Sequence, residues 1–298
     1  MGRVRRGLSI AYATALEVLS EPLSLLVLLA ALVMTVLAPA FHYHQFGEAT
    51  RMARDAGLSS VFTCGMVIAV FGTIRSFRRE VESGTMAMAL AHPVSRTAFF
   101  LAKAGGACAA YLVFTAVVFL TTLVIVDGAA IGGAIAAKSG DIARLYGPNF
   151  AEGVGVIVLP LVLGAALNRF GNRRFVLSSF VLALLLSLAF AGHSVVRDGA
   201  WLLRLLPVAA LIGVLAVVLL SAAAAFAVRL KANAAASAAG VVLLVLLPAI
   251  GNYYRADALA KGGSVPWAYV ALAALAALPA VLVFLLLGIH FINGRDVT

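Results

Sequence analysis

Long apolar runs separated by short polar segments make up most of the chain. A helix needs about 20 apolar residues to cross the hydrocarbon core of a bilayer, which is about 30 Å thick. Eight runs approach this length: Leu23–Phe41, Leu58–Ile74, Ala104–Val126, Gly153–Leu167, Phe175–Gly192, Leu206–Val228, Ala234–Gly251 and Trp267–His290. The fourth and fifth are the shortest, and they fit two spans, a tight helical hairpin or partly re-entrant segments. The pattern predicts an all-α polytopic membrane protein with six to eight transmembrane helices.

Residues 1–22 differ from these runs because their polar and apolar positions alternate at helical spacing. Leu8 and Tyr12 begin an apolar face, and arginines lie around it. This pattern predicts an amphipathic helix in the inner membrane interface. Pro22 suits the first turn of a following helix, so we expect residues 23–298 to form the transmembrane domain. The first apolar run is too long for a signal peptide, and we expect it to be retained.

Composition agrees with a membrane protein and indicates an orientation. The chain is 63% hydrophobic and 11% charged, whereas soluble domains carry about 25% charged residues. The net charge is +10, and 14 of the 22 Lys and Arg residues fall on the inner side if the N-terminus is inside. Basic residues favour cytoplasmic loops, so we predict that both termini are cytoplasmic. No basic patch is interleaved with aromatic residues, so nucleic acid is not an expected partner.

The longest predicted cytoplasmic segment spans residues 75–103. Residues 85–91 are good helix formers, and Pro93 ends this helix because proline removes a backbone donor. Ser95 is a suitable N-cap for the helix that enters the third span. The pattern therefore predicts a short helix between two sharp breaks.

This segment contains residues suited to binding another protein. The candidate coupling residues are Glu80, Glu82, Gly84, Thr85, Met86, Met88, Leu90, Pro93, Ser95 and Arg96. Met86, Met88 and Leu90 would form an apolar knob, and the charged residues would form its polar rim. A knob of this kind fits a groove on a partner protein. The alternative is a solvated loop whose apolar side rests on lipid headgroups.

The same segment resembles a known family. The resemblance is carried by Glu80, Gly84, Thr85, Leu90, the run Pro93-Val94-Ser95-Arg96, and Lys103. This pattern is similar to the cytoplasmic loop of ABC-2 type permeases, which lies between their second and third spans. In that family the loop forms the coupling helix and sits in a cleft of the ATP-binding subunit. The sequence departs from the family in having eight apolar runs rather than six and a thin C-terminal tail.

The resemblance implies a permease subunit of an ATP-driven ABC transporter, acting as an exporter in a bacterial cytoplasmic membrane. A separate ABC ATPase subunit would bind ATP and magnesium, and this chain would hold no cofactor. A second copy of the permease, or a related permease, would complete the membrane domain as a dimer. Membrane lipid is the remaining expected partner.

Residues for energy-converting chemistry are missing from the sequence. No Gly-x-x-x-x-Gly-Lys-Ser/Thr phosphate loop occurs, and no nucleophile and base pair marks an enzyme, so no catalytic residues are expected. The centres of the apolar runs hold no ionisable residue, which argues against an ion-coupled carrier. Neither Cys64 and Cys108 nor His42 and His44 form a metal-ligand cluster.

The alternative function is a non-transporting scaffold or assembly factor that recruits a soluble protein through residues 75–103. A membrane enzyme acting on lipid has no residue set in its favour.

Overall fold

The computed structural model describes residues 2–37, 49–82, 95–139, 149–198, 200–253 and 265–294. Every regular element in these ranges is helical, and no strand occurs among them. The chain divides into two compact units, which are described separately. Unit 1 comprises Met1–Val18, Met66–Leu112 and Ala210–Thr298, and unit 2 comprises Leu19–Gly65 and Val113–Ala209.

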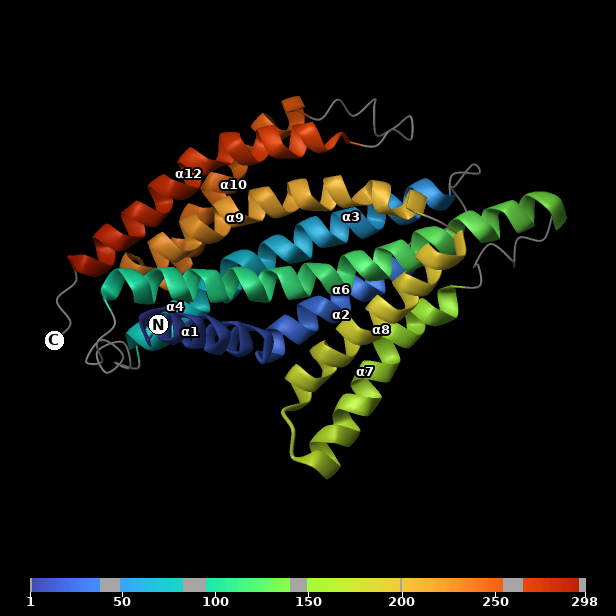
Figure 1. Cartoon of the computed structure of the whole chain (residues 1–298), viewed down its shortest axis with the longest axis horizontal. Helices are drawn as coiled ribbons and strands as arrows, with labels where there is room; N and C mark the ends of the chain where they lie inside the picture. Colours follow the sequence, from blue (N-terminus) through green and yellow to red (C-terminus); the bar gives the residue numbers. More distant parts are fainter. Residues whose placement is uncertain are drawn as a thin grey trace. The chain divides into compact units, whose positions relative to one another are not determined.

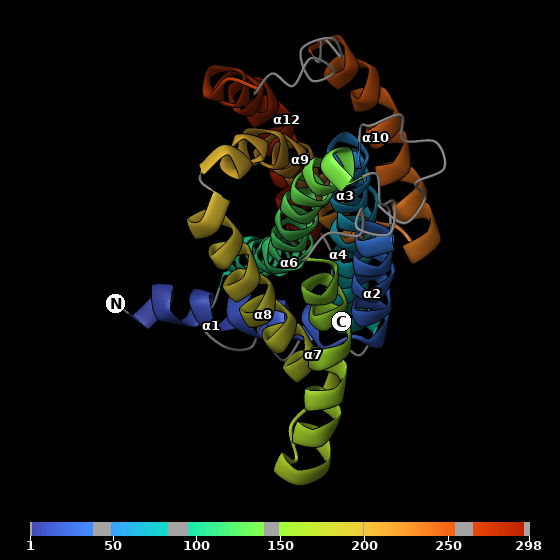
Figure 2. The ribbon, with the colours of Figure 1, turned by 90° about the vertical axis from the view of Figure 1, so that its right-hand side faces the viewer.

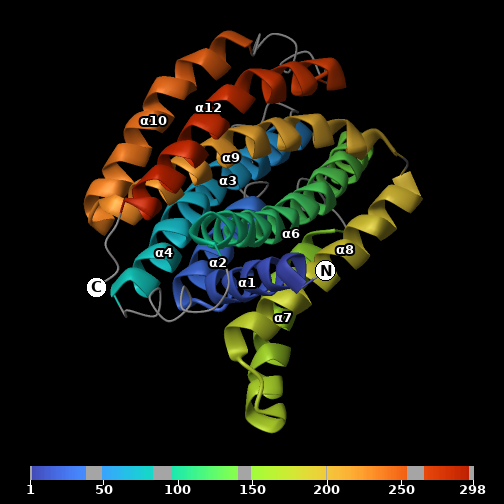
Figure 3. The ribbon, with the colours of Figure 1, turned by 60° about the vertical axis from the view of Figure 1, so that its left-hand side comes forward.

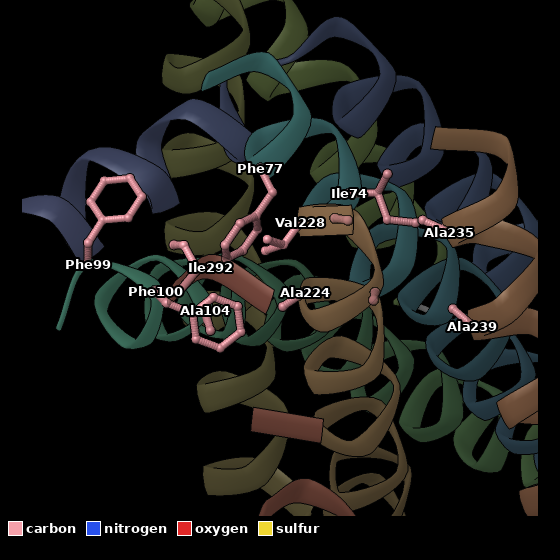
Figure 4. Close-up of a cluster of buried hydrophobic side chains, with 12 residues drawn as sticks. Ile74, Phe77, Phe99, Phe100, Ala104, Ala224, Val228, Ala235, Ala239 and Ile292 are labelled. Carbon is pink, nitrogen blue, oxygen red and sulfur yellow. The ribbon is translucent and has the colours of Figure 1, made fainter. Parts of the chain in front are cut away.

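Unit 1 is a helical bundle with a small-residue core. Its elements are α1 (Gly2–Leu19), the π-helical turn η3 (Ile68–Gly72), α4 (Thr73–Glu82), the start of α6 (Arg96–Ser139), most of α9 (Leu206–Arg229), α10 (Ala232–Tyr253) and α12 (Trp267–Asn293) (Figure 1). In its buried cluster, Ala224 and Val228 of α9 lie beside Phe77 of α4 and Phe100 of α6, and Ala235 of α10 lies beside Ile74 of α4 (Figure 4). The two rings lie 5.5 Å apart between centroids. Small side chains let these helices approach closely, as is usual for helices packed within a membrane.

Unit 2 contains a long helical hairpin beside three further helices. Its elements are α2 (Pro22–Leu37), α3 (Ala49–Val67), the remainder of α6, α7 (Phe150–Gly171), α8 (Phe175–Asp198) and the 3₁₀ helix η5 (Ala200–Leu205). Figure 2 shows α7 and α8 running side by side as this hairpin. Buried hydroxyls such as those of Thr121 and Thr122 donate to the carbonyl four residues back. This bonding satisfies polar groups inside an apolar helix without any partner from another helix.

Six helical segments of the described chain are long and apolar enough to cross a membrane. They are Thr50–Glu80, Arg96–Ile131, Phe150–Gly171, Phe175–Arg197, Leu203–Arg229 and Trp267–Asn293. A seventh is counted if α1 and α2, which are separated by a short break, form one broken span. The prediction of an all-α polytopic membrane protein is therefore confirmed, as is the start of α2 at Pro22.

The fourth and fifth apolar runs form two helices of spanning length, which is one of the alternatives that the sequence left open. The sequence identified the fourth and fifth apolar runs as short, but α7 and α8 have 22 and 24 residues and both reach spanning length. Helix α7 continues through Pro160 and ends at Gly171, before Asn172 in its left-handed conformation, and α8 continues to Asp198. The described apolar helices that fall short are α2, with 16 residues, and Ala232–Leu246 within α10.

Candidate functional site

The helices that flank the predicted docking segment belong to unit 1. Helix α4 ends at Glu82 and α6 begins at Arg96, so Glu80, Glu82, Ser95 and Arg96 can be placed. The six other candidate residues lie outside the described residues: Gly84, Thr85, Met86, Met88, Leu90 and Pro93. The structure therefore describes the helices on either side of the segment, and the docking surface itself stays a prediction.

Ser95 caps α6 as its sequence context predicted. Its hydroxyl oxygen accepts a hydrogen bond from the backbone N–H of Ala98 at 3.2 Å, and its carbonyl accepts one from the N–H of Phe99 at 3.0 Å. The first turn of a helix leaves N–H groups without intrahelical partners, and an N-cap serine satisfies one of them. The start of α6 is thereby fixed where the segment ends.

Lys103 lies at the centre of a buried polar cluster. Its side chain has no exposed surface, and its Nζ is 2.7 Å from Glu80 Oε1 of α4 and 3.8 Å from Glu17 Oε2 of α1. The ammonium group also faces the ring of Phe77 at 5.6 Å from the centroid, within the range of a cation–π interaction. A buried charge is tolerated only when it is paired, so Lys103 holds α1, α4 and α6 together.

Glu17 extends this cluster along α1. Its carboxylate accepts a hydrogen bond from the Ser76 hydroxyl at 3.1 Å and lies 3.7 Å from Nη1 of Arg79. Both partners are on α4, so α1 is attached to α4 through two side chains as well as to α6 through Lys103. We name Glu17, Ser76, Arg79, Glu80 and Lys103 the Lys103 cluster.

The other charged candidates also contact this chain. Glu82 pairs with Arg78 on its own helix and keeps 63% of its side chain exposed. Arg96 donates to the carbonyl oxygens of Ile292 and Asn293 at 3.4 and 3.2 Å. The last carbonyls of a helix lack intrahelical partners, so Arg96 caps the C-terminal end of α12.

The same helices are also closely packed at two glycines. A Cβ atom at Gly288 of α12 would overlap the ring of Phe100, and one at Gly106 of α6 would overlap the carbonyl oxygen of Ala11. Figure 3 shows α1 beside the first turns of α6, where this second contact lies. The helices on either side of residues 83–94 are thus joined to each other, to α1 and to α12.

Unit 2 contains a second polar cluster, which the sequence did not reveal. Asp127 of α6 is 1% exposed and forms an ion pair with Arg197 of α8. The side-chain amide of Asn149, directly before α7, donates to Asp127 Oδ2 at 2.8 Å and to Ser194 Oγ at 3.4 Å. Arg197 donates in turn to Asn149 Oδ1 at 3.2 Å. We name these four residues the Asp127 cluster.

The predicted ends of two apolar runs are corrected by this cluster. The sequence ended them at Val126 and Gly192, which left Asp127 and Arg197 outside the spans. Helices α6 and α8 continue to Ser139 and Asp198, because the ion pair neutralises charges that would otherwise oppose burial. In the described part of the chain, no group of three or more His, Cys, Asp or Glu side chains could hold a metal ion.

These features define a class of protein: a multi-pass membrane protein in which buried polar contacts join the helices on either side of residues 83–94. Among protein families, residues 15–144, less than half of the chain, match the model described as ABC-2 family transporter protein. No curated protein and no solved structure matches the chain. The match includes residues 75–103, so the resemblance of this segment to ABC-2 type permeases is confirmed, and the match supports a permease component of an ABC transporter.

Proposed function

We propose that this chain couples ATP hydrolysis by a separate ABC ATPase subunit to the movement of a substrate across the membrane. Residues 83–94 would dock on the ATPase, and α4 and α6 would carry the resulting displacement into the membrane domain. The observation that carries this proposal is the Lys103 cluster, in which Glu80 before the docking segment pairs with Lys103 after it at 2.7 Å. A segment whose two ends are fixed to each other transmits force as one body.

The contacts at the two ends of the segment indicate which helices would move with it. On its α4 side, Glu80 is joined to α6 and, through Lys103 and Glu17, to α1. On its α6 side, Arg96 is bound to the end of α12. Closure of the ATPase subunits would therefore shift α1, α4, α6 and α12 together, which is the kind of rigid-element movement that alternating access requires.

The assembly and its location extend the family assignment. ABC-2 permeases associate with an ABC ATPase; we propose two permease copies, or this chain with a related permease, above two ATPase subunits. Export, a bacterial cytoplasmic membrane and cytoplasmic termini complete the proposal. The family resemblance and the excess of Lys and Arg on the inner side support them.

Affinity purification of the tagged chain from its native membranes in mild detergent, with mass spectrometry of bound proteins, tests this function. We expect an ABC ATPase subunit with the wild-type chain and its loss with Leu90→Arg, because a charge would interrupt the apolar knob. Ala232→Arg is the matched control, since Ala232 is exposed at the start of α10 on the same predicted side. Equal recovery with Leu90→Arg would exclude this contact, and recovery of another soluble protein without an ATPase would favour the scaffold function.

A further inference from the structure

The turn that joins α7 and α8 presents three arginines and one aromatic side chain. We name residues 168–174 the hairpin tip. Arg169, Arg173 and Arg174 are exposed, and Phe170 is 89% exposed. Asn172 adopts a left-handed conformation, with φ 50°, and the N–H of Arg173 donates to the carbonyl of Leu167 at 3.4 Å. This turn reverses the chain within a few residues, so the three arginines belong to one short stretch of the chain at the end of the hairpin.

The charge of the hairpin tip is not neutralised within the described chain. No Asp or Glu occurs between Gly153 and Val196, and none of the three arginines forms an ion pair with a described carboxylate. Arg78 and Arg197, by contrast, each pair with an acidic side chain. The tip therefore carries about three positive charges that call for anions from outside the chain.

The opposite end of the hairpin is fixed, which defines where the tip lies in a bilayer. Asn149 before α7 is bound in the Asp127 cluster, and a Cβ atom at Gly153 would meet Ile125 and Val36. Helix α7 has 22 residues, which corresponds to about 33 Å at 1.5 Å per residue. This length matches the hydrocarbon core of about 30 Å. The tip thus reaches the headgroup level of the membrane surface opposite Asn149.

We propose that the hairpin tip binds the phosphates of anionic phospholipids in the cytoplasmic leaflet. Guanidinium groups bind phosphate oxygens through paired hydrogen bonds, and Phe170 would insert just beneath the headgroups, where aromatic residues concentrate. The cytoplasmic leaflet carries the anionic lipids, and each basic residue near its surface favours binding on the order of fivefold. Three arginines without a carboxylate therefore select anionic over zwitterionic lipid at this position.

A tryptophan reporter at the tip tests this proposal on the full chain. Phe170→Trp is combined with Trp201→Phe and Trp267→Phe, and the protein is reconstituted in symmetric phosphatidylcholine vesicles. Brominated phosphatidylglycerol or brominated phosphatidylcholine is then added in increasing fraction. We expect half-maximal quenching at a fraction of the anionic quencher at least about fivefold lower than that of the zwitterionic quencher.

Two sets of variants make this result specific to the tip. Replacing all three tip arginines by glutamine is expected to abolish the preference for the anionic quencher. Arg51→Gln/Arg54→Gln is the control, because these arginines already contact Asp55, and the preference should remain. Equal quenching by both lipids, or a preference that survives in the triple variant, would overturn the proposal.

The assay contains no ATPase, so its outcome is independent of the proposed coupling. Because the vesicles are symmetric, it is also independent of the orientation in which the chain inserts. A second experiment adds the ATPase to the same vesicles. If neither lipid is preferred and the ATPase shields the reporter at position 170 from quenching, the tip is a protein contact and the lipid proposal fails.

Discussion

At the scale of single residues, Lys103 is the most consequential side chain of unit 1. It is fully buried and is shared by two carboxylates, Glu17 and Glu80. A buried pair contributes little when compared with a well-packed apolar pair, but removal of one member leaves an uncompensated charge. Removing one charge of the Lys103–Glu80 pair should therefore lower the free energy of unfolding more than removing both charges together.

Lys103→Met is expected to lower the free energy of unfolding by about 3 kcal/mol, because it leaves the Glu80 carboxylate without its cation and removes one of the two cations beside Glu17. Lys103→Met/Glu80→Gln should recover part of this loss. The midpoint of thermal unfolding in detergent measures both effects. Lys231→Met is the control, since Lys231 is exposed and its loss should leave the midpoint almost unchanged. Equal midpoints for the two single variants would show that Lys103 is not held as described.

The same variant also probes coupling. In a reconstituted complex, Lys103→Met should retain the bound ATPase but reduce the stimulation of ATP turnover by substrate, because Glu80 and Lys103 no longer join the ends of the docking segment. A variant that unfolds would lose the ATPase as well, so the two causes can be separated by purification. Full stimulation with the ATPase bound would contradict the proposed role of the cluster.

Gly288 provides a second residue-scale prediction, based on packing alone. Gly288→Ala is expected to destabilise the protein by about 1–3 kcal/mol, because the added Cβ overlaps the buried ring of Phe100. Gly213→Ala on α9 meets no atom within 4 Å and should be neutral or stabilising by up to about 1 kcal/mol. Thermal unfolding of the two variants side by side tests the contrast. A loss of stability of the same size for Gly213→Ala would show that the overlap with Phe100 is not the cause of the destabilisation.

At the scale of elements, the sequence predicted the helices well and their ends less well. Periodicity and apolar length located the spans, and Pro22 and Ser95 marked two helix starts correctly because their signals are local. The Asp127–Arg197 pair joins residues 70 positions apart, and no local pattern shows such a partner. The pairing of Glu80 with the buried Lys103 was missed for the same reason, and the place of Glu80 on the rim of a docking surface stays a prediction.

The Asp127 cluster should determine how firmly the α7–α8 hairpin is attached. Asp127→Asn and Arg197→Gln are each expected to destabilise the protein, and the double variant should lose less than the sum, because the two side chains act as one unit. Hydrogen exchange of the first turn of α7 and the unfolding midpoint measure this coupling. Arg204→Gln, at an exposed arginine of η5, is the control. Strictly additive losses would mean that the pair contributes no joint stabilisation.

At the scale of the whole molecule, the number of crossings decides on which side each terminus lies. Helix α10 is the critical element, because its 22 residues correspond to about 33 Å, enough to cross the hydrocarbon core. If α2 and α10 both cross, the chain has eight spans and both termini lie on the same side, which is the inside in the proposed orientation. If α10 alone fails to cross, the C-terminal end of α12 lies outside.

Single cysteines in a Cys64→Ala/Cys108→Ala background resolve these two topologies. Asn172→Cys, Asn233→Cys and Asn293→Cys should react with a membrane-impermeant maleimide in inside-out vesicles only, and Pro266→Cys should react in right-side-out vesicles only. All four positions are exposed in the structure, so lack of reaction reports on the side of the membrane rather than on burial. Labelling of positions 233 and 266 from the same side would show that α10 does not cross. Labelling of position 172 from outside would place the hairpin tip in the outer leaflet, and the excess of Lys and Arg would then fail to predict the orientation of this chain.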